Sequence, residues 1–402
     1  MRKPNPMLPT GLPTLDPHAT AHLELVQAHI SQKIANMPEG FMPFDQWMDL
    51  ALYAPGLGYY AAESTKFGST DATQILPAGD FTTAPELSPL FGQTLARQVA
   101  QILEQAESVQ VLEFGAGSGA LAAALIPALQ ALGINPDYQI LDVSADLKAR
   151  QQQRLQGLES SVTWLTRLPD SFSGCIIANE VLDAMPATLF RWDEAGQLTE
   201  LGVKASSDNP PYAWDARTAN SAMAQAVSQR MPPLPGYQSE INLRAEAWIT
   251  EMGKWLQRGA ALLIDYGFPQ REYYHPQRAE GTLMCHFRHH AHGQPLIYAG
   301  LQDITTHVDF TAMADAALAG GLDVLGYTSQ ARFLMNAGLP ELLTAASQDD
   351  GVSTTDKVSS MSAVQKLLSE AEMGELFKVL AIGRGITPPL MGFMRGDRRD
   401  RL

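Results

Sequence analysis

Between residues 109 and 179, short apolar runs alternate with longer segments whose apolar positions recur at helical spacing. The runs are VQVLEF, DYQILDV, SVTWL and GCIIAN, and the segments between them predict helices ending near Leu132 and Leu155. Strands that alternate with helices form parallel sheets joined by right-handed crossovers. The pattern therefore predicts an α/β core.

The same pattern resumes later in the chain. A helix is predicted near residues 246–257, followed by a buried strand in ALLIDYG and a helix at 311–319. Two further strands are predicted at 323–327 and 376–385. The core elements are thus spread over most of the chain, and long stretches of other character separate them.

Those other stretches are less regular. Apolar spacing predicts helices at 19–36, 44–52 and 89–105, all upstream of the core. TLFRW and LTELGVK flank DEAGQ, so a hairpin with Gly196 in its turn is expected.

Four segments complete the organisation along the chain. Residues 63–78 are small and polar, as in an exposed loop, and residues 268–308 show no clear period. The stretch 330–373 has helical spacing with a polar interruption, and the tail RGDRRDRL is expected to be a frayed, solvated end.

Composition and charge exclude several classes of protein. The chain has 402 residues, 45% of them hydrophobic, so it can bury a sizeable core. A net charge of −15 and a pI near 5.0 argue against a nucleic-acid partner. No apolar run is long enough to span a bilayer and no signal peptide is visible, so we expect no membrane insertion and a cytoplasmic location. Cys175 and Cys285 alone cannot build a disulfide framework or a CxxC metal site.

Three glycines, Gly115, Gly117 and Gly119, follow the first predicted strand of the core as GxGxG. Glycines there let the backbone turn sharply and approach a ligand at a helix N-terminus. The spacing differs from the GxGxxG of dinucleotide sites, and the loop lacks the lysine with which a P-loop holds phosphates. Taken alone, the triplet indicates either a nucleotide-type cofactor or a tight turn that binds nothing.

Two acids beside the glycines narrow the choice. Glu113 lies two residues before the first glycine, where a carboxylate would repel a pyrophosphate but attract the ammonium group of a methionine moiety. Asp142 ends the next strand, where an acid can bind both ribose hydroxyls, which NAD and S-adenosylmethionine (SAM) share. Together these acids favour SAM over a dinucleotide.

The later strands agree with that cofactor. A fifth strand, a helix, a sixth strand and a distant seventh strand fit the sheet of SAM-dependent methyltransferases, with strand order 3-2-1-4-5-7-6. We therefore predict an α/β fold, a class I (Rossmann-like) seven-stranded methyltransferase with an N-terminal helical segment and helical and hairpin insertions.

Several longer motifs occur in order along the chain and carry a family resemblance. They are ALYAPGLGYY, GDFTTAPELSPLFG, EFGAGSG, ANEVLDAMP, IDYG, EYYHPQRAEGTLMCHFRHHAH and LQDITTHVDFT. This series resembles the MidA-like family of SAM-dependent methyltransferases, over roughly residues 38–338. Mitochondrial members of that family are complex I assembly factors credited with methylating an arginine of a complex I subunit. The resemblance implies a bacterial member with that fold, cofactor and reaction type, and a protein substrate, possibly a complex I core subunit.

The expected division of the chain follows from these elements. Residues 1–105 form an N-terminal helical segment and cofactor lid, 106–385 the methyltransferase core, and 386–402 a tail. Insertions in the core are expected at about 187–255, 268–308 and 330–372.

The acids of NEVLDAMP are candidates for the methyl acceptor site. An arginine is protonated in isolation, so carboxylates must hold it and stabilise its charge during transfer. Asn179 ends the fourth predicted strand, with Glu180 next and Asp183 three residues on. We predict that Asn179 binds the cofactor and that Glu180 and Asp183 are catalytic. The alternatives are a cap of a short helix for Asp183 and a solvated loop acid for Glu180.

The upstream motif GDFTTAPE is expected to cover the cofactor. Asp80, Thr83 and Pro85 are predicted cofactor-binding residues, and Glu86 a substrate-binding residue. The alternative is a turn punctuated by proline that caps the helix starting near Pro89.

Six of the nine histidines lie between His275 and His307. Their spacing in CHFRHHAH matches no ordinary structural zinc site, so we predict no metal. A substrate-facing loop is the preferred interpretation, with Tyr274 and Arg288 contributing hydrogen bonds; packed or solvated histidines are the alternative.

DITTHVDFT adds two more candidates for the acceptor site. Asp303 is predicted to bind substrate, and His307 to take up the proton that the guanidinium releases. Asp309, before a predicted helix, has the position of an N-cap.

Three functions remain open at this point. The first is protein arginine N-methylation, and the second is methylation of a small molecule or another side chain. The third is an assembly chaperone that binds SAM without catalysis. The acceptor, the degree of methylation and the oligomeric state do not follow from the residues.

Overall fold

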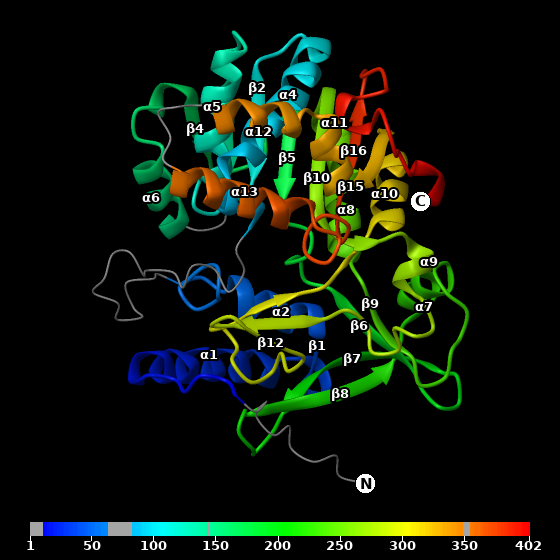
Figure 1. Cartoon of the computed structure of the whole chain (residues 1–402). Helices are drawn as coiled ribbons and strands as arrows, with labels where there is room; N and C mark the ends of the chain where they lie inside the picture. The colour runs from blue at the N-terminus through cyan, green and yellow to red at the C-terminus, as the bar shows by residue number, and fades with distance from the viewer. Residues whose placement is uncertain (1–10, 63–82, 143–144, 349–353) are drawn as a thin grey trace. The chain divides into compact units, whose positions relative to one another are not determined.

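The computed structural model describes residues 11–62, 83–142, 145–348 and 354–402 (Figure 1). The predicted loop at 63–78 and Asp80 lie outside the described residues. The chain forms two compact units, each assembled from three segments: Met1–Phe81, Ala184–Arg244 and Arg271–His307 in unit 1, and Thr82–Asp183, Ala245–Gln270 and Val308–Leu402 in unit 2.

Unit 2 contains the predicted methyltransferase sheet. Over its described residues the strand order is β15-β16-β10-β5-β2-β3-β4, with the short β14 (Val308–Asp309) beside β10. Renumbered along the chain, this is the predicted order 3-2-1-4-5-7-6. The strands are β2 (Gln110–Phe114), β3 (Asp137–Leu141), β4 (Val162–Leu165), β5 (Phe172–Asn179), β10 (Leu256–Phe268), β15 (Asp323–Ser329) and β16 (Phe377–Arg384).

The directions of these strands also agree with the prediction. β2, β3, β4, β5 and β10 pair in parallel. β16 is antiparallel to both β10 and β15, which is the predicted reversed pair at the end of the sheet. The unit therefore has the class I, Rossmann-like methyltransferase fold.

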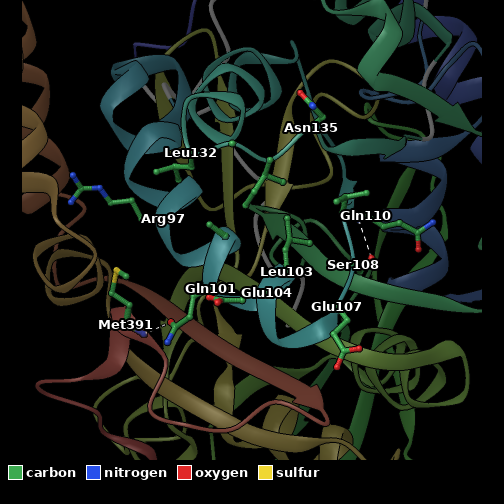
Figure 2. Close-up of a pocket in the computed structure, with 14 residues that line it drawn as sticks. Arg97, Gln101, Leu103, Glu104, Glu107, Ser108, Gln110, Leu132, Asn135 and Met391 are labelled. Carbon is green, nitrogen blue, oxygen red and sulfur yellow. Dashed lines mark hydrogen bonds between the residues drawn. The ribbon is translucent and has the colours of Figure 1, made fainter.

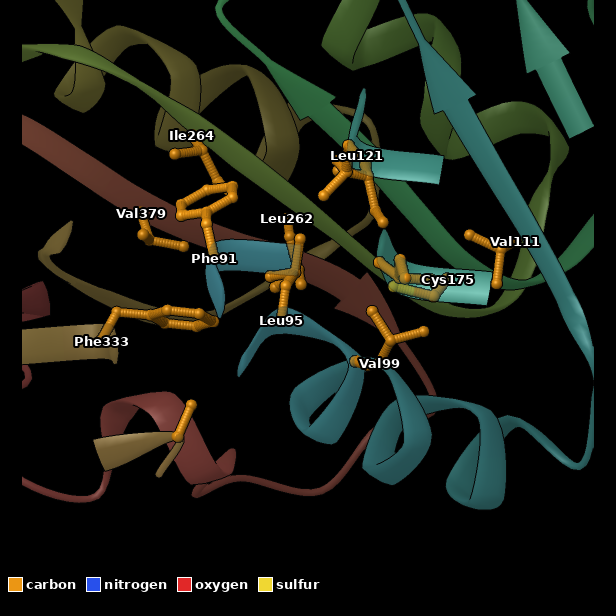
Figure 3. Close-up of a cluster of buried hydrophobic side chains, with 14 of the residues drawn as sticks. Phe91, Leu95, Val99, Val111, Leu121, Cys175, Leu262, Ile264, Phe333 and Val379 are labelled. Atoms are coloured by element: carbon orange, nitrogen blue, oxygen red, sulfur yellow. The ribbon is translucent and has the colours of Figure 1, made fainter. Parts of the chain in front are cut away.

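Helices cover this sheet with apolar faces. α4 (Pro89–Ala106) packs against α5 (Ala120–Ala131), and its Phe91, Leu95 and Val99 lie in one core cluster with sheet residues such as Leu262 and Val379 (Figure 3). α4 therefore belongs to unit 2, although the linear division of the sequence placed it in the N-terminal segment. The reason is its period, which presents one continuous apolar face to the sheet. The other helices of this unit are α3 (Ala84–Leu87), α6 (Ala145–Arg154), α8 (Leu243–Trp255, which starts in unit 1), α10 (Phe310–Ala319), α11 (Gln330–Asn336), α12 (Leu339–Gln348) and α13 (Thr354–Leu368), with the 3-10 turn η3 (Glu159–Ser161).

The C-terminal tail is ordered, so the prediction of a frayed end is wrong. Asp397 accepts a hydrogen bond from the backbone N–H of Tyr327 (3.2 Å), and Arg399 donates to the carbonyl of Val324 (3.0 Å). Arg398 forms an ion pair with Glu375. These partners lie 23 to 75 positions away, so the local charge pattern could not reveal them. The tail contains the short turns η4 (Met391–Phe393) and η5 (Arg399–Arg401).

Unit 1 is built around an antiparallel sheet of order β1-β7-β6-β9, with β8 paired to β7. The predicted hairpin is β6 and β7, and Gly196 has a left-handed φ of 76° in its turn. Phe44 and Trp47 of α2 pack in one core with residues of the sheet, so the upstream helices and the predicted insertion fold together. The elements are α1 (Pro17–Ala35), η1 (Pro38–Gly40), β1 (Phe41–Pro43), α2 (Phe44–Tyr53), β6 (Thr188–Trp192), β7 (Leu198–Ala205), β8 (Tyr212–Thr218), α7 (Ser221–Ser228) and β9 (Gln238–Ile241).

The stretch without a clear period also has regular structure. β11 (Met284–Phe287) pairs antiparallel with β12 (His290–His292) and with β13 (Asp303–Thr305), after a short helix α9 (Gln270–Tyr273). Strands of three or four residues are too short to display an alternating pattern, which is why the sequence did not predict them.

Across the described residues, every helix falls short of the length or apolarity that crossing a bilayer requires.

Candidate active site

The glycine loop joins β2 to α5 at the carboxyl edge of the unit 2 sheet. Gly115, Gly117 and Gly119 all have left-handed φ, at 60°, 54° and 83°, which strains any residue with a Cβ. At Gly117 no atom lies within 4 Å of a built Cβ, so the requirement there is conformational. Gly119 is the N-cap of α5, which places the loop at a helix N-terminus. This is a geometry that accepts an anionic or hydrogen-bond-accepting ligand group.

Glu113 lies in β2 just before this loop and is 3% exposed. The hydroxyl of Tyr138 donates a hydrogen bond to its carboxylate (2.7 Å). Burial, together with the charge of the nearby Asp142 and against the Tyr138 hydrogen bond, raises the pKa of Glu113 to about 7. Glu113 is therefore a buried acid that an incoming cation would ionise, as the ammonium group of SAM requires.

Asp142 directly follows β3, at the same edge of the sheet, because β2 and β3 are parallel. One of its oxygens accepts a hydrogen bond from Gln151 of α6 (2.9 Å). Gly115 donates its N–H to Leu141 (3.1 Å), so the loop is tied to the strand that carries Asp142. An acid and a glycine loop thus lie on adjacent strand ends, which is the arrangement predicted for SAM; the contact of Asp142 with ribose stays a prediction.

Helix α3 carries the described part of the GDFTTAPE motif and contacts the glycine loop. Thr83 is its N-cap residue and Pro85 lies in its first turn. Glu86 forms an ion pair with Arg154 (2.7 Å) and accepts a hydrogen bond from Ser118 of the loop. Burial alone would raise the pKa of Glu86, but Arg154 and Ser118 outweigh it and lower the pKa. The Glu86 side chain is therefore engaged at the cofactor loop; its predicted contact with substrate stays a prediction.

The acids of the NEVLDAMP motif follow β5. Asn179 ends the strand and donates a hydrogen bond to Glu180 (3.1 Å). Glu180 has a left-handed φ of 54°, uncommon for a residue with a side chain. Asp183 is 5% exposed, so it is a buried acid. A Cβ built on Gly115 would lie 3.1 Å from Val181, which places this turn against the glycine loop.

A third acid of this cluster, Asp265 in β10, was quoted in the IDYG motif but was not predicted as a site residue. It is 1% exposed and accepts backbone N–H groups from Leu182 (3.0 Å), Asp183 (3.2 Å) and Tyr266 (2.8 Å). Burial, followed by the charges of Asp183 and Glu180, raises its pKa well above the usual range. The one signal in the sequence was an acid inside an otherwise apolar strand, since a buried charge needs a reason.

These carboxylates define the chemistry of the edge. Glu113, Asp142, Glu180 and Asp265 lie at or near the carboxyl ends of β2, β3, β5 and β10, which are parallel neighbours. Ligands of open α/β sheets bind outside these ends. A group of four acids, of which Glu113 and Asp265 are buried, favours a cationic ligand, and SAM carries both an ammonium and a sulfonium charge.

The remaining predicted site residues belong to unit 1. The Tyr274 hydroxyl donates to the carbonyl of Glu240 (3.1 Å), and the backbone N–H of His307 donates to Thr282 (2.9 Å). Tyr274 therefore contacts Glu240 directly. His307 is linked to Glu240 through Thr282, whose hydroxyl donates to the Glu240 carboxylate. The roles predicted for Tyr274 and His307 toward substrate stay predictions.

Arg288 and Asp303 have other partners in unit 1. Arg288 forms an ion pair with Asp16 (2.9 Å) and donates to the carbonyl of Thr14 (3.3 Å). It therefore ties the β11–β12 turn to the start of α1, a structural contact that the sequence did not reveal. Asp303 accepts a hydrogen bond from the hydroxyl of Tyr60 (2.8 Å). Their contacts with substrate stay predictions.

A surface groove of about 1450 Å³ lies elsewhere on unit 2 (Figure 2). Arg97, Glu104 and Gln110 are among its lining residues. Gln110 starts β2, whereas the glycine loop follows the end of that strand. The groove is therefore at the opposite edge of the sheet from the site described above.

Several known proteins are similar to this chain. A crystallised protein from Burkholderia thailandensis, bound to S-adenosyl-homocysteine, is 45% identical and matches with a TM-score of 0.87, covering 98% of this chain and 100% of its own. The mitochondrial protein arginine methyltransferase NDUFAF7 homolog of Drosophila melanogaster is 26% identical over 98% of this chain and 96% of its own length. The human mitochondrial protein arginine methyltransferase NDUFAF7 is 24% identical over 88% and 82%.

The family comparison covers most of the core. Residues 94–328 match the family described as S-adenosyl-L-methionine-dependent methyltransferase. This span includes the glycine loop, both cofactor acids and all three carboxylates after β5 and in β10. The chain therefore belongs to this family of methyltransferases, and its cofactor is SAM.

Proposed function

We propose that this enzyme methylates a guanidinium nitrogen of an arginine in a protein, with a subunit of respiratory complex I as the first candidate substrate. Two kinds of support exist. Relatives from several animals carry the name protein arginine methyltransferase. The second kind of support is the set of carboxylates at the turn after β5, several of which could contact one cation.

The observation that carries the proposal is the grouping of Glu180, Asp183 and Asp265 beside the glycine loop. Burial and the charges of Asp183 and Glu180 raise the pKa of Asp265, so a cation bound beside these acids would favour the ionised form of Asp265. A guanidinium is planar, always charged and suited to two parallel hydrogen bonds with a carboxylate. A neutral small acceptor would leave this charge uncompensated.

Bound SAM would supply a methyl group on a sulfonium, whose carbon is open to in-line attack by an electron-rich nitrogen with S-adenosyl-homocysteine as the leaving group. In the proposed reaction a bond forms between the arginine nitrogen and the methyl carbon, the carbon–sulfur bond breaks, and the nitrogen loses a proton. Glu180 and Asp183 hold the guanidinium in line, and Asp265 fixes their turn through its backbone N–H contacts. Glu113 and Asp142 hold the amino and ribose ends of the cofactor. A carboxylate of the turn accepts the proton.

The test uses SAM with a labelled methyl group and an extract from cells that lack the protein. Wild type is expected to label one protein band, and mass spectrometry of that band is expected to find methylarginine. Glu180→Gln is expected to lower the labelling rate by roughly 100-fold or more, because transition-state charge is no longer balanced. Glu107→Gln, an exposed acid paired with Arg258, is the matched control and should label at the wild-type rate.

Other outcomes would replace the proposal. Label in small molecules alone would identify a metabolite methyltransferase, and label on another side chain would change the acceptor. SAM binding without transfer to any fraction of the extract would indicate a binding protein that acts by docking.

A further inference from the structure

Gln151 of α6 is fully buried, with 0% exposure, yet its side chain ends in a polar amide. The amide nitrogen donates to Oδ2 of Asp142 (2.9 Å) and to the carbonyl of Gly117 (3.0 Å). The amide oxygen accepts from the indole N–H of Trp164 (2.9 Å). One side chain therefore joins the end of β3, the glycine loop and the end of β4.

The orientation of this amide follows from its partners. A carboxylate and a carbonyl accept hydrogen bonds, whereas the indole N–H of Trp164 only donates. A flipped amide would face Trp164 with its N–H groups and Asp142 with its oxygen, so it would lose all three bonds. Both amide hydrogens are therefore used in hydrogen bonds, one to Asp142 and one to the glycine loop.

Gln151 also lies close to the glycine loop at Gly119. A Cβ built on Gly119 would be 3.4 Å from the Cα of Gln151, so α6 and the loop are separated by little more than the space of one methyl group. One helical turn on, Arg154 contacts Ser118 of the same loop and pairs with Glu86. The exposed Arg154–Glu86 pair contacts the loop at Ser118, whereas the buried amide of Gln151 links the loop to Asp142.

We propose that Gln151 is a positioning residue of the cofactor site, which holds the ribose-binding carboxylate of Asp142 and the glycine loop in one fixed arrangement. A carboxylate has about four acceptor positions, so Oδ2 of Asp142 can accept from Gln151 and from a ribose hydroxyl together. By donating to Asp142, Gln151 also orients that carboxylate before the cofactor arrives. Binding then requires little rearrangement, which is the condition for high affinity.

The test is the affinity for S-adenosyl-homocysteine, measured by calorimetry on the full chain at pH 8. Gln151→Glu has the same shape but no hydrogens to donate, and it brings a second negative charge to Asp142. We expect affinity to fall roughly 10- to 100-fold, the cost of unpaired buried charge. Gln98→Leu is the matched control: Gln98 is another fully buried glutamine of unit 2, bonded to Gly392 (2.8 Å). It should bind within about twofold of wild type.

A pH profile separates positioning from a general loss of structure. The ionisable groups that face position 151 are Asp142, with Glu113 beyond it, and Arg154 paired with Glu86. As pH falls, the introduced carboxylate and Asp142 share a proton, so the affinity gap between Gln151→Glu and wild type should narrow by several-fold between pH 8 and pH 6. A destabilised fold would not recover in acid.

A milder variant covers the case in which Gln151→Glu does not fold. Trp164→Phe removes only the donor that orients the amide, and Trp164 is partly exposed, so this variant should fold. We expect it to bind roughly two- to fivefold more weakly, the size of one lost hydrogen bond. The proposal is overturned if folded Gln151→Glu binds within twofold of wild type at pH 8, or if Trp164→Phe and Gln98→Leu both bind like wild type.

Discussion

Two groups of acids stand at the same edge of the unit 2 sheet, and their surroundings differ. Glu113 and Asp142 each accept a hydrogen bond from a neutral side chain, Tyr138 and Gln151. Glu180, Asp183 and Asp265 instead form a cluster of like charges, in which Asp265 accepts hydrogen bonds from backbone N–H groups of the turn. The first group is arranged to receive a ligand in a set position. The second is a group of acids in which a bound cation would favour ionisation of the buried Asp265.

The largest expected effect comes from the second group. Both carboxylate oxygens of Asp265 accept hydrogen bonds from backbone N–H groups. In Asp265→Asn one of these oxygens is replaced by an amide nitrogen, which is a donor and cannot accept from the N–H group that it faces. We expect methyl transfer to fall roughly 100- to 1000-fold, because the turn that carries Glu180 and Asp183 loses the acceptor that orients it. Affinity for S-adenosyl-homocysteine should change by less than about threefold, because the cofactor acids are untouched.

The control for that prediction is Asp397→Asn. Asp397 also accepts two backbone N–H groups, from Tyr327 and Arg399 (3.2 Å each), but it belongs to the C-terminal tail. The Asp397→Asn variant should have a lower free energy of unfolding and the wild-type rate of methyl transfer. Equal losses of activity in both variants would show that Asp265 has only a structural role.

The next effect is on the first group. Glu113→Gln keeps the shape and can still accept from Tyr138, but it removes the charge that faces the ammonium group. We expect affinity for S-adenosyl-homocysteine at pH 8 to fall roughly 10- to 100-fold. Calorimetry measures this directly. An unchanged affinity would place the ammonium group elsewhere.

The pH dependence of S-adenosyl-homocysteine binding by the wild type should report the ionisation of Glu113. Burial raises the folded-state pKa of Glu113 from 4.5 to about 7, and the ligand's ammonium group needs the ionised form. Below pH 7 binding must release a proton, so affinity should fall by up to about tenfold per pH unit, and it should be level above pH 8. The unliganded protein should show the opposite trend: its stability falls as pH rises from 4.5 to 7, since the folded state holds a proton that the unfolded state has lost. A flat binding profile in wild type, or the same slope in Glu113→Gln, would contradict the assignment.

The smallest effect is expected at the exposed pair. Arg154→Gln removes the ion pair with Glu86 and the contact with Ser118, but both partners of the ion pair are about two-fifths exposed. Solvent screens such pairs, so affinity for S-adenosyl-homocysteine should fall by no more than about threefold. Measured in low and high salt, the difference from wild type should shrink with salt. A larger, salt-independent loss would mean that α3 and Arg154 contribute to binding directly.

The parts of the site that could be predicted are recognised from short stretches of the sequence. Three glycines at a strand end, an acid two residues earlier and another at the end of the next strand are all positioned by neighbours within a few residues. The order of the sheet also followed, because parallel crossovers leave few topologies. Glu180 and Asp183 could be singled out for the same reason, although their roles await the experiments above.

The residues that were missed act over long separations. Gln151 lies in a polar helix with nothing to distinguish it from Gln152 and Gln153 beside it, until the fold brings it to Asp142 and Trp164. Asp265 contacts backbone groups 82 and 83 positions away. Unit 1 is assembled from three separate segments, so its hairpin was predictable but its union with the upstream helices was not.

By itself, the sequence determined the α/β class, the strand order and a cofactor that pairs cationic groups with acids, because period, turns and strand-end chemistry are short-range properties of the chain. Only the tertiary structure decided which glutamine donates to Asp142, which aspartate accepts from the turn after β5, and that the basic tail packs along β15. Those choices depend on burial and register between distant segments, and no local pattern records them.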